Sequence, residues 1–234
     1  MPRLTRMQYA IEGDNFQVLD VTLAGDEMMY SEAGALIYMS DNVVFVTDVW
    51  GGYAKGLKRT FIKESFFMNQ FTLQNPDEPG HIGFGGHIMG KIIPMQIMDQ
   101  RRYVLQKGAF LCAEKSVNLD IAFIQKIGAG IFGGEGFVFQ HLSGKGTAFI
   151  KASGDLKHIH LDKGERIRID TGLVVGFEES VKYNITRIKG MRAMLFGGEG
   201  MFLTTLEGEG DVILQTFNMK RFKKNLKVEM EYGS

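Results

Sequence analysis

The sequence predicts an all-β protein built from repeated modules. Three observations carry this prediction: an internal repeat, many short runs of apolar or alternating residues, and glycines where those runs end. Residues 103–154 align with residues 167–218 without a gap, at a constant spacing of 64 residues. An internal repeat of this length is a supersecondary unit copied along the chain, so it constrains the architecture before any single residue is considered.

The repeat is carried mainly by glycine motifs. Residues 132–136 and 196–200 both read Phe-Gly-Gly-Glu-Gly, and each is followed by a Gly-x-Gly element, at 144–146 and 208–210. A phosphate-binding loop would need a following helix with Lys and Ser or Thr, which neither copy has. We therefore interpret both copies as structural turns, and the Gly-x-Gly elements as hairpin turns that need positive φ.

A third, degenerate copy lies upstream. Residues 32–37 resemble residues 106–111, and residues 61–66 resemble residues 132–137. The sequence therefore predicts three sandwich-like or barrel-like β modules, at residues 12–90, 91–156 and 157–222, followed by a C-terminal tail at residues 223–234.

The expected strands are four to eight residues long, rich in Val, Ile, Phe and Thr, and separated by Gly, Asp or Asn. In chain order they are Phe16–Thr22, Glu27–Ser31, Ala35–Met39, Val43–Thr47, Ser65–Thr72, Lys91–Met98, Tyr103–Gln106, Phe137–His141, Thr147–Lys151, Arg166–Asp170, Val181–Ile188, Met201–Leu206 and Asp211–Thr216. The run Arg166–Asp170 alternates strictly, which predicts a strand with one face in water. Only Phe217–Leu226 has a spacing compatible with a helix.

Composition and charge narrow the function classes. The 27 Lys and Arg residues balance the 27 Asp and Glu residues, so the basic surface that nucleic-acid binding needs is not expected. No run approaches the roughly 20 apolar residues of a membrane span, and no apolar signal-peptide segment opens the chain. These features predict a cytoplasmic protein without a transmembrane segment.

Several single residues have a structural interpretation and a functional alternative. The lone Cys112 lies in an apolar run and is interpreted as a small buried residue. Trp50, in a loop that only the first module has, is either an anchor on the sheet or a partner contact. The basic segment Lys220–Lys227 is interpreted as a solvated face, with acidic lipid or nucleic acid as the alternative partner. His81 and His87 are expected to be loop histidines.

The sharpest chemical candidate is the set His158, His160 and Glu165, followed by Gly172. Its spacing is that of a cupin metal motif, and histidines two apart share one strand face. However, the spacing Glu27 to Gly34 repeats the Glu-to-Gly half of the motif. A cupin also needs a later proline and histidine, but none follow this segment. A solvated histidine pair on a strand edge is therefore the preferred interpretation, with a metal site as the alternative.

The chain resembles a known family, the altered-inheritance-of-mitochondria family. The resemblance rests on Glu27 with Gly34-Ala35-Leu36, Gly56-Leu57-Lys58-Arg59, Glu64-Ser65-Phe66-Phe67, Gly108-Ala109-Phe110-Leu111, Gly136-Phe137 with Gly144-x-Gly146, and Asp170-Thr171-Gly172-Leu173-Val174-Val175. Lys63 departs from the pattern, because the family usually carries glycine there. The resemblance implies a fold like the tryptophan RNA-binding attenuator protein, related to the double-stranded β-helix, with modules about a pseudo-threefold axis. It implies no established enzyme activity, and fungal relatives suggest a link to mitochondrial inner-membrane organisation.

The leading functional hypothesis is a non-enzymatic scaffold or binding protein without a cofactor. Open β modules leave strand edges that assembly could cover, so a homo-oligomer is expected, with a trimer as one candidate. The alternative from a different class is a metal-dependent cupin-like enzyme that uses His158, His160 and Glu165. A second alternative is RNA or small-ligand binding, which rests on fold analogy alone.

Overall fold

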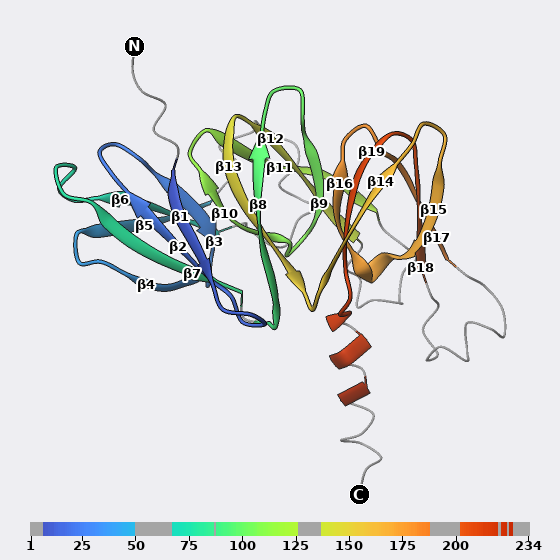
Figure 1. The fold of residues 1–234 in the computed structure, drawn as a ribbon, viewed down its shortest axis with the longest axis horizontal. Helices are drawn as coiled ribbons and strands as arrows, with labels where there is room; N and C mark the ends of the chain where they lie inside the picture. The colour runs from blue at the N-terminus through green and yellow to red at the C-terminus, as the bar shows by residue number, and fades with distance from the viewer. Residues whose placement is uncertain are drawn as a thin grey trace, which may run out of the picture. The chain divides into compact units, whose positions relative to one another are not determined.

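The computed structural model describes residues 7–49, 67–86, 88–125, 137–187, 202–219, 221–223 and 225–226. These residues form antiparallel β-sheets, with a helical segment near the C-terminus (Figure 1), so the predicted all-β fold is confirmed. The chain divides into two compact units, which are described separately. The first holds Met1–Arg102, Gly108–Asp120 and His141–Lys151, and the second holds Tyr103–Lys107, Ile121–Gln140 and Ala152–Ser234.

The first unit contains two sheets. Their strands are β1 (Gln8–Glu12), β2 (Val18–Leu23), β3 (Met29–Glu32), β4 (Leu36–Met39), β5 (Val43–Val49), β6 (Phe67–Leu73), β7 (Gly80–Gly85), β8 (Gly90–Ile97), β10 (Phe110–Glu114) and β13 (Gly146–Ser153). One sheet has the strand order β1-β2-β7-β4, and the other has the order β5-β6-β3-β10-β13-β8. Strand β4 is therefore an edge strand of its sheet.

The other two sheets have most of their residues in the second unit, although residues 117–120 of β11 and 141–144 of β12 belong to the first. Their elements are β9 (Tyr103–Gln106), β11 (Val117–Gln125), β12 (Phe137–Gly144), β14 (Leu156–Leu161), β15 (Arg166–Asp170), a 3-10 helix η1 (Thr171–Leu173), β16 (Val174–Glu178), β17 (Lys182–Arg187), β18 (Phe202–Glu207) and β19 (Gly210–Gln215). The strand orders are β11-β12-β9-β16-β19-β14 and β15-β18-β17. Strand β15 is likewise an edge strand.

Each unit has its own apolar core. In the first unit, β2 alternates so that Leu19, Val21 and Leu23 are fully buried while the residues between them are partly exposed. This period of two is the pattern of a strand with one face on the core. Phe71 and Phe84 pack edge to face in the same core, with ring centroids 5.3 Å apart.

The core of the second unit is centred on Phe177 of β16. Its side chain is fully buried. It packs against Phe139 and Tyr183, with ring centroids 6.2 Å and 5.6 Å away. Such tilted aromatic contacts stabilise a core beyond the area they bury.

The Gly-x-Gly elements have the positive φ that the sequence predicts, but they do not close hairpins. Gly144 and Gly208 have φ of 101° and 127°. Strands β12 and β13 belong to different sheets, and so do β18 and β19. The hairpin prediction is therefore wrong: each glycine turn carries the chain from one sheet into another.

Side chains explain the second glycine of each element. A Cβ on Gly146 would lie 2.7 Å from both the Glu114 carboxylate and the Ser116 hydroxyl. A Cβ on Gly210 would lie 3.0 Å from the carboxylate of Glu178 and 2.7 Å from the hydroxyl of Ser180. These glutamates accept hydrogen bonds from the Thr147 and Asp211 amides, so the carboxylates pin the start of β13 and of β19.

Some strands escaped prediction because their sequences look like turns or isolated apolar runs. Strand β7 contains Gly80, Gly83 and Gly85, which a sequence pattern assigns to a turn. The structure needs two of these glycines because β4 covers them. A Cβ on Gly83 would overlap the Tyr38 ring, and a Cβ on Gly85 would lie 2.5 Å from the Ile37 side chain.

Equivalent strands occupy matching positions along the chain. Strands β10, β13, β16 and β19 begin at residues 110, 146, 174 and 210, which the 64-residue spacing relates in pairs. A register shift occurs between Phe110 and Cys112 in β10, and another between Val174 and Gly176 in β16. In β4 a shift of the same kind lies between Leu36 and Tyr38. The division into three modules at residues 12–90, 91–156 and 157–222 stays a prediction.

The described helical residues are 219, 221–223 and 225–226, inside the segment Phe217–Leu226 that the sequence marks as compatible with a helix. Asn218 precedes them, and its side-chain oxygen accepts the Arg221 backbone N–H at 3.1 Å. A side-chain acceptor for the third helical N–H is the usual helix N-cap. Asn218 therefore fixes where this helix begins.

Candidate functional site

The three candidate metal ligands do not meet in one site. His158 and His160 lie on β14, and both are exposed. Glu165 lies in the following turn, where its carboxylate accepts the Asp162 backbone N–H at 3.0 Å. Within the described residues, no group of three or more His, Cys, Asp or Glu side chains is arranged to hold a metal ion. Nothing in the described geometry supports the cupin-like alternative.

The role of Glu165 recurs in the first unit. There, Glu27 accepts the Ala24 backbone N–H at 2.9 Å, again three residues back along the chain. The same carboxylate-to-amide contact thus closes the turn before β3 and the turn before β15. A glutamate that stabilises a tight turn in two places is a structural residue, which accounts for the glutamate of the repeated spacing.

His160 also belongs to a recurring arrangement. Its ring Nδ1 lies 2.7 Å from the Asp211 carboxylate, directly across the β14–β19 pair. In the first unit, the hydroxyl of Thr22 lies 3.3 Å from Nδ1 of His81, its cross-strand neighbour. A third polar pair joins β8 and β13, where the Gln96 amide lies 3.2 Å from the Thr147 hydroxyl. Cross-strand polar pairs are a unit of sheet stabilisation, so His160 fills a structural position.

The His160–Asp211 pair should make the stability depend on pH. The hydrogen bond to Asp211 raises the pKa of His160 above its ordinary value of 6.5. The pair therefore contributes its full stability below about pH 6.5, the pKa in the unfolded chain, and loses it as pH rises through the higher folded-state pKa. We expect Asp211→Asn to lower the pKa of His160 in an NMR titration.

Asp162→Asn is the control for this titration. It removes a nearby charge but leaves the hydrogen bond, so it should lower the pKa of His160 by less. An unchanged pKa in Asp211→Asn would show that the pair is not formed in solution.

The other sequence candidates are a buried cysteine, an exposed histidine on a strand, and residues outside the described ones. Cys112 is fully buried, and burial raises the pKa of its thiol, as expected for an inert cysteine. His81 was expected in a loop, but it lies on strand β7, where it is exposed and takes part in the cross-strand pair above. Trp50, His87 and both Phe-Gly-Gly-Glu-Gly motifs lie outside the described residues.

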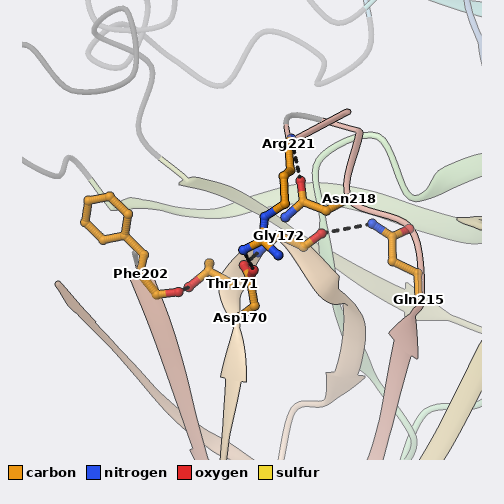
Figure 2. A network of polar contacts seen from close by, with 7 residues as sticks. All are labelled: Asp170, Thr171, Gly172, Phe202, Gln215, Asn218 and Arg221. Atoms are coloured by element: carbon orange, nitrogen blue, oxygen red, sulfur yellow. Dashed lines mark hydrogen bonds and ion pairs between the residues drawn. The ribbon is translucent and has the colours of Figure 1, made fainter. Parts of the chain in front are cut away.

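A polar network at the end of β15 was not predicted from the sequence. Asp170 accepts the Gly172 backbone N–H at 3.0 Å, and its second oxygen lies 2.9 Å from the Arg221 guanidinium (Figure 2). The Gln215 amide donates to the Gly172 carbonyl at 3.1 Å, and the Thr171 hydroxyl donates to the Phe202 carbonyl at 3.0 Å. The network therefore joins β15, η1, β18, β19 and the C-terminal helix.

This network changes the interpretation of the basic segment Lys220–Lys227. Arg221 is engaged by Asp170, whose carboxylate is mostly buried. Its ion pair attaches the helix to the second unit, so this residue has a structural partner. Lys223 is exposed, and the segment's remaining lysines lie outside the described residues.

One unusual surface in the first unit is the edge strand β4. Ile37, Tyr38 and Met39 are 54%, 45% and 37% exposed. The Tyr38 hydroxyl donates to Asp20 on β2, and this hydrogen bond raises the pKa of Tyr38 to about 12. Consecutive exposed apolar residues on a sheet edge are uncommon in monomers, because an open edge can pair with another chain.

Fold and surface together define an antiparallel all-β protein whose polar pairs support its sheets and whose edge strand β4 is apolar and exposed. The chain belongs to the family described as mitochondrial biogenesis AIM24, whose model matches residues 9–217. The family resemblance drawn from the sequence is confirmed. The likeness to the attenuator protein stays a prediction.

Two similar proteins come from Streptococcus pyogenes. An uncharacterised protein of the serotype M6 strain is 28% identical over 231 residues, which cover 95% of this chain and 90% of the relative. A crystal structure of a protein from the same species aligns with a TM-score of 0.77 at 25% identity, covering 95% of this chain and 99% of the other. Within the described residues, no helix is long and apolar enough to cross a membrane.

Proposed function

We propose that this chain is a non-enzymatic scaffold or binding protein that works as a homo-oligomer. The observation that carries the proposal is the exposed apolar strand β4. Its outer edge has no neighbouring strand among the described residues. Pairing with another chain would remove apolar surface from water and satisfy open backbone groups, both of which favour association.

The candidate chemistry also favours a structural role. His160 and Glu165, the two most suggestive ionisable residues, are engaged in a cross-strand pair and a turn that both recur in the first unit. Residues that recur as structural contacts in different parts of a chain are poor candidates for a single active site. The same recurrence supports the three-module organisation that forms part of this proposal.

The cytoplasm is the location we propose, and the buried free thiol of Cys112 is compatible with it. A scaffold also agrees with the family description, mitochondrial biogenesis, because organisation of larger assemblies needs binding surfaces rather than catalysis. The balanced charge argues against RNA as the main partner.

Light scattering coupled to size-exclusion chromatography tests the proposal on the full-length chain. At micromolar concentration we expect a mass that is a whole multiple of 26.2 kDa and greater than one copy. A single monomer peak across this range would overturn the assembly that the proposal requires.

A further inference from the structure

Two strand pairs inside the chain have the same register. Strand β3 pairs antiparallel with β10, so that Ser31 lies opposite Cys112. Strand β9 pairs antiparallel with β16, so that Leu105 lies opposite Gly176. The spacing of 64 residues that relates Cys112 to Gly176 also relates β10 to β16 as whole strands. We call these two pairs the internal junctions.

Strands β3, β9 and β15 are equivalent, and so are β4, β10 and β16. Residues 29–32 of β3 align with residues 103–106 of β9, and residues 103–106 align with residues 167–170 of β15. Strands β4, β10 and β16 share the register shift described above. One strand of each type therefore remains without a junction partner among the described residues: β4 and β15.

Burial shows what the missing partner would cover. The equivalents of Ile37 are Leu111 and Val175, and those of Met39 are Ala113 and Phe177; all four are buried at the internal junctions. Strand β15 likewise lacks the burial seen in its equivalents β3 and β9. Arg168 is exposed on β15, whereas Tyr30 and Val104, at the same position of β3 and β9, are buried.

We propose that β15 of one copy pairs with β4 of a second copy, head to tail, in the register of the internal junctions. That register places Tyr38 opposite the partner's Ile169, and Met39 opposite the partner's Arg168. This inference rests on the proposed homo-oligomer and names the surfaces that form it. The partner of β4 is a second copy of this chain because β15, the strand that fits its open edge, belongs to the same sequence.

The charges on the two edges favour this pairing over pairing of like strands. Strand β15 carries two exposed arginines, of which Arg166 forms an ion pair with Glu207 on β18. The charge of Arg168 disfavours the pairing of two β15 edges. Strand β4 has no charged residue between Leu36 and Met39. The charge on β15 therefore disfavours a β15–β15 pair, whereas the uncharged β4 can pair with β15 without repulsion.

The position of strand β15 is fixed by contacts that leave its other edge open in the described part of the chain. One side pairs with β18 along its whole length, from Arg166 to Asp170. The Asp170 network fixes its C-terminal end (Figure 2). Because the pairing joins different surfaces on the two copies, it can repeat from copy to copy, as a closed ring or as an open filament.

The test is a charge swap followed by light scattering. Met39→Arg places one arginine opposite another and should convert the oligomer to monomer at micromolar concentration. Adding Arg168→Glu to Met39→Arg restores an opposite-charge pair and should restore the oligomer. Met98→Arg is the matched control, because Met98 is also an exposed methionine but lies outside both edges; its oligomer should match wild type.

A second experiment tests the register and remains informative if a charged variant folds poorly. A mixture of Met39→Cys and Arg168→Cys chains should form a disulfide-linked heterodimer under mild oxidation, since directly opposed residues in antiparallel strands lie within disulfide reach. The native Cys112 is buried and should not compete. Thermal melts confirm that each variant is folded.

The outcomes separate the two proposals. An oligomer that survives Met39→Arg and yields no heterodimer would overturn the edge pairing and leave the homo-oligomer standing. A monomeric wild-type chain would overturn both. If a chain that carries both Met39→Cys and Arg168→Cys formed a disulfide and kept the mass of a monomer, β4 would pair with β15 of its own chain rather than of a second copy.

Discussion

Replacing Phe177 with alanine should lower the free energy of unfolding of the second unit by about 3–5 kcal/mol. The side chain is fully buried and packs against Phe139 and Tyr183, so its removal leaves a cavity at the centre of the unit. Chemical denaturation monitored by circular dichroism measures the change. Hydrogen exchange of residues 202–215, compared with residues 67–85 of the first unit, shows whether the loss is confined to the second unit. This matters because two units need not unfold together.

Phe222→Ala is the control for this prediction. Phe222 is 43% exposed and packs against Phe217, with ring centroids 5.2 Å apart. We expect its replacement to cost less than about 1 kcal/mol, in the range of most surface substitutions. Equal losses for the two variants would contradict the central position of Phe177.

The second large effect concerns two matched glycines. Gly144→Ala should cost about 2–5 kcal/mol, because two penalties add. Its φ of 101° is unfavourable for a residue with a Cβ, and that Cβ would overlap the Ser116 carbonyl oxygen. Gly208→Ala meets only the first penalty, since its nearest atom, the Ser180 carbonyl oxygen, would lie 3.4 Å away. It should cost about 1–2 kcal/mol.

Thermal and urea denaturation of the two alanine variants decide the comparison. The two glycines occupy the same place in the repeat, so the sequence gives no reason for their costs to differ. The structure predicts that Gly144→Ala is the more damaging change. A larger loss for Gly208→Ala would show that the two turns differ from the described geometry.

The strands that the sequence predicted are those whose signal is local. Arg166–Asp170 alternates between apolar and polar residues, and it forms β15 with the predicted bounds. Strand β10 was not predicted, because its residues Phe110–Glu114 are buried on both faces and show no alternation. Strand β7 was hidden by glycines whose purpose depends on Tyr38 and Ile37, some 45 residues away along the chain.

For the candidate site as well, local features could be predicted from the sequence and contacts between distant residues could not. His160 was singled out correctly as an unusual residue, but its partner Asp211 lies on another strand and gives no signal in a local motif. Glu165 was matched to Glu27 by spacing, yet only the structure shows that both close turns. The open edges of β4 and β15 could not be predicted at all, since strand order depends on pairings between distant segments.

The shared register of the internal junctions has an evolutionary consequence. Consider a gene that gains or loses one 64-residue copy of the repeat. Strand β3 could then pair with β16, because Ser31 and Gly176 already occupy equivalent positions in the two internal junctions. Unequal recombination could therefore change the length of this protein by whole copies of the repeat without creating a new interface. An insertion of one residue within β10 or β16 would instead turn every later side chain of that strand to the opposite face. In proteins built this way, the number of repeat copies can change more easily than the number of residues within a strand of each copy.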